Sequence, residues 1–369
     1  MRELLIFLAP FGAAAVIYLL PQRRFSFWLA SGASLAMAFL DSGEFSWIWG
    51  TFAFAFLLGW FVEAPPLTSF WAMLSLGLAR GSFLFPQSPF EALILSSSLL
   101  LILPALWTGQ SLDFSGISVF LLLALGPFLT SSLPGEWRAA LVLASLMGAF
   151  PFHLWVRSAM RDGPSPGALL LVAGFRAIIL LWLGKEEVEI SWAVFQDILK
   201  WLGIISILWG GLQALMAKEW GEIGAYVATV EAGVMLLLAV KAGFEVSIVY
   251  SILAGLALLT FGAGSWGVKR FMEEGRTVTP AVFLLVAGLL ATAGLPLTPG
   301  YPATALALNY LGGKEGLLIL AGKFGIMAGG MRLLQPLAPA LRPDPSLRSS
   351  RAVVLLITAI LFFALNFAL

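Results

Sequence analysis

Four ionisable side chains fall within long apolar stretches of the sequence, and their types could move or hold a proton. They are Glu63, Arg176, Glu231 and Lys323. A charge in the middle of a membrane is costly, so such residues are rare there and usually functional. A buried glutamate or lysine can change its protonation state, whereas an arginine stays charged. The two glutamates and the lysine could therefore relay a proton, and Arg176 could only fix a field or pair with a carboxylate.

Each of these charges also has a structural interpretation. Arg176 and Lys323 have long stems that can reach towards a helix end. Glu231 is near the middle of its apolar stretch, so its carboxyl group has to be protonated, paired or hydrated. Glu63 is deeply placed only if residues 45–85 form one long bent helix; otherwise it caps a span. These alternatives stay open at the level of the sequence.

The elements that would position these residues are membrane helices. The chain has 369 residues, of which 60% are apolar and 11% are charged. A soluble domain has about 45–50% apolar and about 25% charged residues, and it could not bury this much apolar surface. We therefore predict an all-α polytopic membrane protein with a single membrane domain over 1–369, in contact with lipid. A net charge of +1 argues against a nucleic-acid partner.

The apolar stretches give a helix count and one interruption. They predict 14 transmembrane helices if every stretch spans, or 12 if 45–85 is one bent helix and 115–133 lies on the surface. One span is expected over 137–155, and a C-terminal transmembrane helix over 351–369. A broken helix is expected near 294–302, because its apolar stretch contains Gly294, Pro296, Pro299 and Gly300. The break is either a kink for packing or part of an ion path, since freed backbone groups must face protein or water.

The loops predict an orientation, because Lys and Arg concentrate on the cytoplasmic side. Two alternating sets of second-half loops differ in their basic residues. The richer set holds Arg157, Arg161, Lys218, Lys269, Arg270, Arg276, Arg342, Arg348 and Arg351. The poorer set holds Lys185, Lys241 and Lys314. We therefore expect the richer set in the cytoplasm of a bacterial or archaeal cell, with the protein in the inner membrane and both termini on the outer side.

The rare residue types limit the cofactors. The chain has no cysteine and a single histidine, His153. Iron–sulfur ligation, thiolate zinc sites and bis-histidine haem ligation are therefore excluded for this chain. We expect it to bind no cofactor and no metal, and to contain no catalytic residue.

Three stretches, in this order, resemble one family. They are Pro151–Trp155 followed by Gly163–Pro166, Ala214–Glu219 running to Gly233, and Ala293–Tyr301. They are similar to the P-F-H-x-W, A-L-x-Q-x-D-x-K-R and A-G-[IL]-P-x-x-x-G-F motifs of the antiporter-like membrane subunits of respiratory complex I. That family includes subunits N, L and M and the Mrp antiporters. The resemblance implies an antiporter-like core over 50–335 and favours the subunit N branch.

The resemblance also implies a proton path, from which this chain departs. In the family, protons are thought to cross by a buried Glu–Lys pair and a line of lysine and histidine residues. The three lysine places fall here on Leu146, Arg176 and Thr304. The histidine place falls on Glu231, and the glutamate place falls near Glu63. The chain is thus expected to be a divergent member that keeps the scaffold with a degenerate lysine relay.

The resemblance implies a non-catalytic membrane-arm subunit of a complex I-like oxidoreductase of the NADH, ferredoxin, quinone or hydrogenase type. The subunit would support or carry redox-coupled proton translocation beside other membrane-arm subunits. Quinone, flavin and iron–sulfur clusters are then expected only in partner subunits. Two alternatives remain. One is a stand-alone or two-component cation/proton antiporter, or an inorganic-carbon transporter subunit. The other is a non-conducting structural subunit. Proton and sodium both remain open as the ion.

Overall fold

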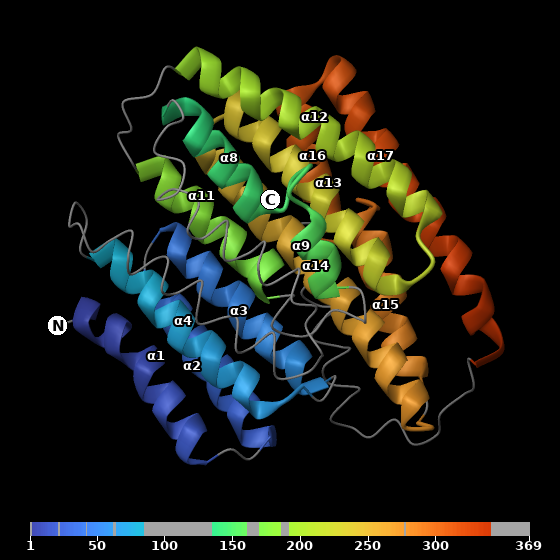
Figure 1. The fold of residues 1–369 in the computed structure, drawn as a ribbon. Coiled ribbons are helices and arrows are strands. Elements are labelled where there is room, and N and C mark those ends of the chain that lie inside the picture. The colour runs from blue at the N-terminus through green and yellow to red at the C-terminus, as the bar shows by residue number, and fades with distance from the viewer. Residues whose placement is uncertain are drawn as a thin grey trace.

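The computed structural model is a bundle of helices (Figure 1). It describes residues 2–20, 23–41, 43–61, 64–84, 135–160, 170–185, 192–276 and 278–340. No strand occurs within these ranges. Four of the described helices are long and apolar enough to cross a membrane, and five shorter apolar helices accompany them. The predicted all-α membrane architecture is confirmed. The segments 115–133 and 351–369 lie outside the described residues, so the total of 12 to 14 helices stays a prediction.

The first four helices form one side of the bundle. They are α1 (Arg2–Leu19), α2 (Arg23–Leu40), α3 (Glu44–Phe61) and α4 (Pro66–Leu84). Helix α3 packs on α2, and α4 packs on α1. Asp41 links three of these elements, because Arg80 donates to both of its carboxylate oxygens at 2.8 and 3.0 Å and the Trp49 indole donates at 3.0 Å. This charge pair therefore holds the end of α2 against α3 and α4.

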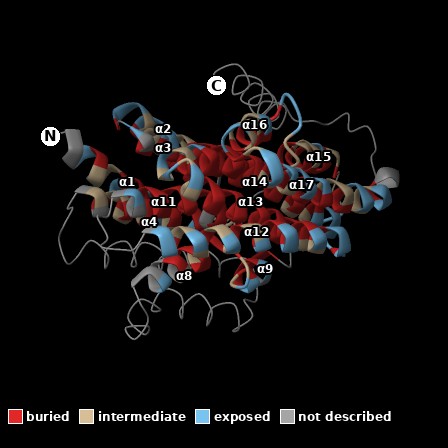
Figure 2. Cartoon of the chain, turned by 90° about the horizontal axis from the view of Figure 1, so that it is seen from above, coloured by how far each residue is buried: buried red, intermediate tan, exposed pale blue. Residues whose placement is uncertain are grey.

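Two long helices form the centre of the molecule. They are α13 (Trp220–Lys241) and α14 (Phe244–Glu273). Of their most apolar stretches, 94% of α13 and 89% of α14 is buried. A helix that is apolar on every side is expected to be enclosed by other helices. Figure 2 shows both helices largely in the buried colour, with exposed residues on the surrounding helices.

The flanks of α13 are covered by α12 (Trp192–Met216) and α17 (Gly313–Leu334). Only 39% of each of their apolar stretches is buried. Their exposed side chains are large and apolar, which suits contact with lipid or with another membrane helix; they include Trp201, Leu208, Leu212, Leu320 and Phe324. A Cβ on Gly211 would lie 2.8 Å from the Cα of Gly322. Small residues thus let these two helices approach closely.

The expected interruption is present. Helix α15 (Thr279–Thr292) ends before the break, and α16 (Gly300–Leu311) begins after it. Gly294 has a φ of +78°, and a Cβ on Gly300 would lie 1.6 Å from the carbonyl oxygen of Ala291. Side chains larger than hydrogen do not fit at this second position. The predicted broken helix near 294–302 is therefore confirmed.

The structure excludes one open alternative about helices and corrects one expected span. A single bent helix over 45–85 does not form, because α3 ends at Phe61, α4 begins at Pro66 and the two pack on different helices. Proline at the first position of α4 suits a helix start, and it disfavours helical backbone just before it. The span expected over 137–155 stops early, since α8 (Gly135–Met147) ends where Gly148 adopts a φ of +69°. The short helix α9 (Leu154–Met160) follows.

Charged residues gather at two opposite ends of the bundle. At one end, Arg157 pairs with Glu222 at 2.8 Å, beside the start of α13. At the other end, Lys241 lies 3.7 Å from Glu315, beside the end of α13. Helix α13 runs from the first end to the second, and α14 returns. Basic residues from the two alternating loop sets therefore lie at opposite ends.

A further ion cluster lies at the C-terminal end of α14, which is at the same end of the bundle as Arg157 and Glu222. Arg270 and Arg276 donate to the two carboxylate oxygens of Glu274 at 2.8 and 2.7 Å. These hydrogen bonds, that from Arg270 foremost, lower the pKa of Glu274 to about 2. The carboxyl group therefore stays ionised throughout the neutral range.

Candidate functional site

The centre of the bundle contains a buried ion pair. The Lys323 ammonium on α17 lies 2.8 Å from Oε1 of Glu231 on α13. Only 3% and 4% of the two side chains is exposed. Lys323 therefore does not extend to a helix end, and the Glu231 carboxyl group is paired. A buried pair of this kind is costly to assemble, so it is weak evidence for stability and better evidence for a function.

The packing of α13 explains why this carboxyl group is enclosed. Glu231 lies in the middle of a helix whose residues from Ile223 to Leu238 are all buried. Two residues further on, a Cβ on Gly233 would lie 2.6 Å from the carbonyl oxygen of Gly203. The absence of a side chain at Gly233 thus lets α12 pack closely on α13. The carboxyl group of Glu231 meets side chains of α17 and α14.

Lys323 also binds the end of the broken helix. Its ammonium donates to the carbonyl oxygen of Thr292, the last residue of α15, at 3.0 Å. The carbonyls just before it accept backbone bonds from the break, because Leu295 donates to Leu290 and Gly294 donates to Ala291. A helix C-terminus has carbonyls without intrahelical partners and a partial negative charge. Lys323 therefore joins the carboxylate of α13 to the carbonyl end of α15.

A tyrosine completes the coordination of the carboxylate. The Tyr250 hydroxyl on α14 donates to Oε2 of Glu231, and Tyr250 is fully buried. One carboxylate oxygen thus binds the ammonium, and the other binds the phenol. Tyr250 was not among the residues predicted from the sequence. The signal was available, because it is the one tyrosine within the apolar run Phe244–Glu273.

Arg176 lies close to this pair but does not join it. It is the second residue of α11 (Phe175–Lys185), which directly follows a π-helical turn, η1 (Leu170–Gly174). Its guanidinium is buried and donates to the carbonyl oxygen of Met147, the last residue of α8. Glu231 and Tyr250 are near enough to interact with it electrostatically. Its Nε has no hydrogen-bond partner within the described part of the chain.

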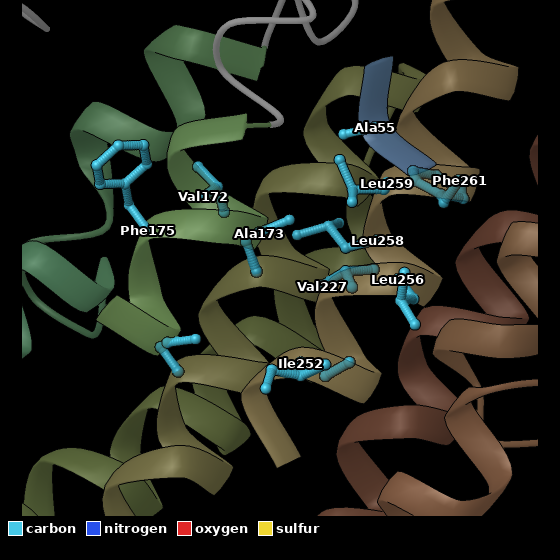
Figure 3. Close-up of a cluster of buried hydrophobic side chains, with 14 of the residues drawn as sticks. Ala55, Val172, Ala173, Phe175, Val227, Ile252, Leu256, Leu258, Leu259 and Phe261 are labelled. Carbon is cyan, nitrogen blue, oxygen red and sulfur yellow. The ribbon is translucent and has the colours of Figure 1, made fainter. Parts of the chain in front are cut away.

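The π-helical turn places Arg176 by packing on α14. A Cβ on Gly255 would lie 2.8 Å from the carbonyl oxygen of Ala173. Figure 3 shows the apolar layer at this contact, where Val172 and Ala173 of η1 lie beside Leu258 of α14. Such π-helical turns are rare and occur frequently at functional sites. The turn leads directly into α11, which carries Arg176.

Three cations of the described bundle share one mode of binding. Lys323, Arg176 and Arg332 donate to the carbonyl oxygens of Thr292, Met147 and Ala217 respectively. Thr292 and Met147 are the last residues of their helices, and Ala217 follows the last residue of α12. Cations are favoured at such helix ends. The two deepest cations are therefore fixed by interrupted helices as well as by charge.

The other residues singled out from the sequence are placed as follows. Glu63 lies outside the described residues. Thr304, at a family lysine place, is buried and donates to the carbonyl oxygen of Gly300 at 2.7 Å. Leu146, at another, is partly buried against the apolar core. His153 accepts a hydrogen bond from the Trp209 indole at 3.1 Å, away from the ion pair.

The cluster can do proton chemistry and cation binding. Lys323 and Tyr250 carry exchangeable protons, the Glu231 carboxylate can accept one, and the three come from three different helices. Arg176 supplies a permanent positive charge nearby. No group of three or more His, Cys, Asp or Glu side chains suited to a metal occurs in the ranges that the structure describes.

Replacing Tyr250 with phenylalanine tests the strength of this coordination. Tyr250→Phe removes the donor to Glu231 and leaves a buried carboxylate oxygen without a partner. A hydrogen bond to a charged group contributes about 1.5–3 kcal/mol, so we expect a loss of that size in the free energy of unfolding. Thermal unfolding of the purified protein measures it. Tyr310→Phe is the matched control, because Tyr310 is 52% exposed; equal effects of the two changes would contradict the assignment.

Comparison with known proteins gives partial sequence matches. No family model matches the chain. It is 28% identical to F(420)H(2) dehydrogenase subunit M of Methanosarcina mazei over 204 residues, which is 48% of this chain and 40% of that protein. It is 29% identical to NADH-quinone oxidoreductase subunit N of Halorhodospira halophila over 191 residues, 45% of this chain and 38% of that protein. The chain therefore spans about two fifths of the length of these relatives.

Solved structures match over the whole chain. A chain of the membrane-bound sulfane sulfur reductase, an archaeal respiratory membrane complex, has a TM-score of 0.69 at 13% identity and covers all of this chain. A chain of the Mrp complex from Dietzia sp. DQ12-45-1b has 0.70 at 12%. A chain of respiratory complex I from Thermus thermophilus has 0.65 at 19% identity and 99% coverage. The predicted resemblance and its fold are confirmed, and the chain is an integral membrane protein.

Proposed function

We propose that this chain is an antiporter-like, membrane-arm subunit of a multi-subunit, redox-driven ion-translocating complex, and that it carries protons through its centre. The buried Glu231–Lys323 pair at the end of a broken helix supports this function best. A chain that served only as a spacer would gain nothing from two opposite charges in an apolar core, because apolar residues of similar volume are as stable or more stable there.

The relatives support the redox part of the proposal. Their names describe subunits of an F(420)H(2) dehydrogenase and of NADH-quinone oxidoreductases. This chain would be a non-catalytic subunit of such a complex, beside other membrane-arm subunits. Quinone, flavin and iron–sulfur clusters would belong to partner subunits. The chain itself has no cysteine and one histidine.

The path departs from the one that the resemblance implied. Glu231 and Lys323 come from α13 and α17, whereas two of the family's lysine places hold Leu146 and Thr304. The proton would therefore pass through the Glu231–Lys323 pair, which differs from the family's lysine places, with Arg176 as a fixed charge and not as a carrier. The richer basic loop set would face the cytoplasm, in the inner membrane of a bacterium or archaeon, with both termini outside. The grouping of the loop charges at two ends of α13 supports this orientation.

A double variant separates conduction from structure. In Glu231→Gln/Lys323→Met the pair becomes uncharged, so the helices can pack without a buried unpaired charge. We expect the complex to assemble and to keep its electron transfer, while proton translocation per electron falls. The measurement is proton uptake into vesicles that contain the purified complex, with its subunits identified by mass spectrometry. A matched control is Glu315→Gln/Lys241→Met, because this second pair is partly exposed at 3.7 Å.

The outcomes separate the candidate functions. Unchanged proton translocation in the double variant would favour the alternative that this chain is a non-conducting structural subunit. The Mrp fold match supports one other candidate, a multi-subunit cation/proton antiporter. That candidate predicts co-purification with membrane subunits alone, without redox subunits, and cation-driven proton movement. A chain that purifies by itself as an active monomer would contradict both complexes.

A further inference from the structure

The Lys323 ammonium lies at a point where oxygen atoms from two separate elements converge. Oε1 of Glu231 is 2.8 Å away, and the carbonyl oxygen of Thr292 is 3.0 Å away. Tyr250 holds the other carboxylate oxygen, which fixes the carboxylate in place. These groups are almost completely buried. The ammonium thus occupies a preformed, buried cluster of oxygen ligands.

This set of ligands would suit a free cation. Carboxylate and backbone carbonyl oxygens are the ligands that hard cations prefer. The carbonyl end of a half-helix inside a membrane is a place where transporters coordinate sodium ions. The end of α15 at the break is such a place, since Thr292 is its last helical residue. The group at this place is the Lys323 ammonium, a monovalent cation that is covalently attached to α17.

We propose that Lys323 determines the ion specificity of this subunit: its ammonium occupies a site that would otherwise bind sodium, and it thereby restricts the path to protons. The inference rests on the proposed function and adds the identity of the ion to it. An attached cation can lose or gain a proton in place, but it cannot leave. A sodium ion could reach the carboxylate only if the ammonium were absent.

The charge of the cluster is consistent with this exchange. Arg176 and Lys323 contribute two positive charges, and Glu231 contributes one negative charge, so the cluster has a net charge of +1. Lys323→Met lowers this to zero and leaves the two oxygen ligands in place. One bound sodium ion restores the charge that the packing of the wild-type cluster accommodates. A divalent cation would exceed it.

The experiment uses the purified complex with Lys323→Met in this subunit. Its midpoint temperature of unfolding is measured in sodium chloride and in choline chloride at equal ionic strength. We expect sodium to raise the midpoint of Lys323→Met in a saturable way, because a ligand that binds only the folded state stabilises it. The wild-type complex and the double variant Glu231→Gln/Lys323→Met should show no shift that is specific to sodium. Lys241→Met is the matched control at a surface pair.

The outcomes decide the inference. Absence of a sodium-specific shift in Lys323→Met overturns it, and so does an equal shift in the double variant, which lacks the carboxylate. If Lys323→Met assembles poorly in choline, recovery of the complex in sodium supports the site, and failure in both salts for Lys323→Met and Lys323→Ala overturns it. Wild-type proton translocation that requires sodium also overturns it.

Failure of the proposed function would look different. The sodium shift is measured as stability, so it does not depend on translocation or on electron transfer. If the uncharged double variant pumps normally, the conducting function is wrong whatever the sodium shift shows. If that variant stops pumping while sodium leaves Lys323→Met unchanged, the function stands and the specificity role of Lys323 is wrong.

Discussion

Glu231→Gln should destabilise the folded chain by about 3–5 kcal/mol, because removing one partner leaves a buried charge uncompensated. Lys323 would then face an amide, with Arg176 adding a second cation to the same core. Lys323→Met should cost less, since Arg176 and the Tyr250 hydroxyl still stabilise the remaining carboxylate. The double variant Glu231→Gln/Lys323→Met should recover most of the loss. The order of stabilities thus reports the net charge that each variant leaves in the core.

Thermal unfolding of the four proteins measures this cycle. The same cycle at Lys241 and Glu315 is the control, because an exposed pair contributes about 0–1 kcal/mol and these side chains are 42% and 21% exposed. Additive effects of the two core substitutions would show that they do not interact. A cost of Lys323→Met equal to that of Glu231→Gln would show that Arg176 does not stabilise the carboxylate.

The second large effect is expected at the break between α15 and α16. Gly300→Ala would place a methyl group 1.6 Å from the carbonyl oxygen of Ala291. Overpacking in a core costs typically about 1–3 kcal/mol, and here the obstacle is backbone, so we expect at least the upper end. The two half-helices would have to separate. The carbonyl of Thr292 would then move relative to Lys323, so we also expect reduced proton translocation.

The midpoint of thermal unfolding and proton uptake into vesicles give the two readouts for Gly300→Ala. Gly32→Ala in α2 is the matched control, because a Cβ there meets no atom within 4 Å. Exposed helical glycine is less favourable than alanine by about 1 kcal/mol, so the control should be neutral or stabilising. If both alanine variants behave alike, the close contact of α16 with α15 is not what positions the break.

The sequence predicted the buried residues and the helix break of the site, but it did not predict which of these residues contact each other. Burial of Arg176, Glu231 and Lys323 follows from apolar neighbours along the chain, and the break follows from its glycines and prolines. The pairing of Glu231 with Lys323 joins residues that are 92 positions apart. Only the packing of α13 against α17 creates it, and neither local pattern nor family spacing contained it. Tyr250 was missed because a single tyrosine in an apolar helix is also typical of ordinary core packing.

The errors have local physical causes. The end of α8 at Met147 depends on the left-handed backbone of Gly148, which a count of apolar residues does not detect. The separation of α3 from α4 depends on Pro65 and Pro66, and the sequence left one bent helix over 45–85 open because apolar residues continue on both sides of these prolines. In both places, backbone geometry overrode hydropathy.

The enclosure of α13 and α14 has a consequence for traffic to the site. Their most apolar stretches are almost completely buried, so protein separates the ion pair from the lipid phase. We therefore expect a proton to reach the pair along the helices and not from the lipid. Its route would lead towards the end marked by Arg157 and Glu222 or the one marked by Lys241 and Glu315. The direction of proton movement would then be controlled at the two ends of the bundle. A blocking reagent should act from the aqueous compartments and be ineffective when it is dissolved in the membrane.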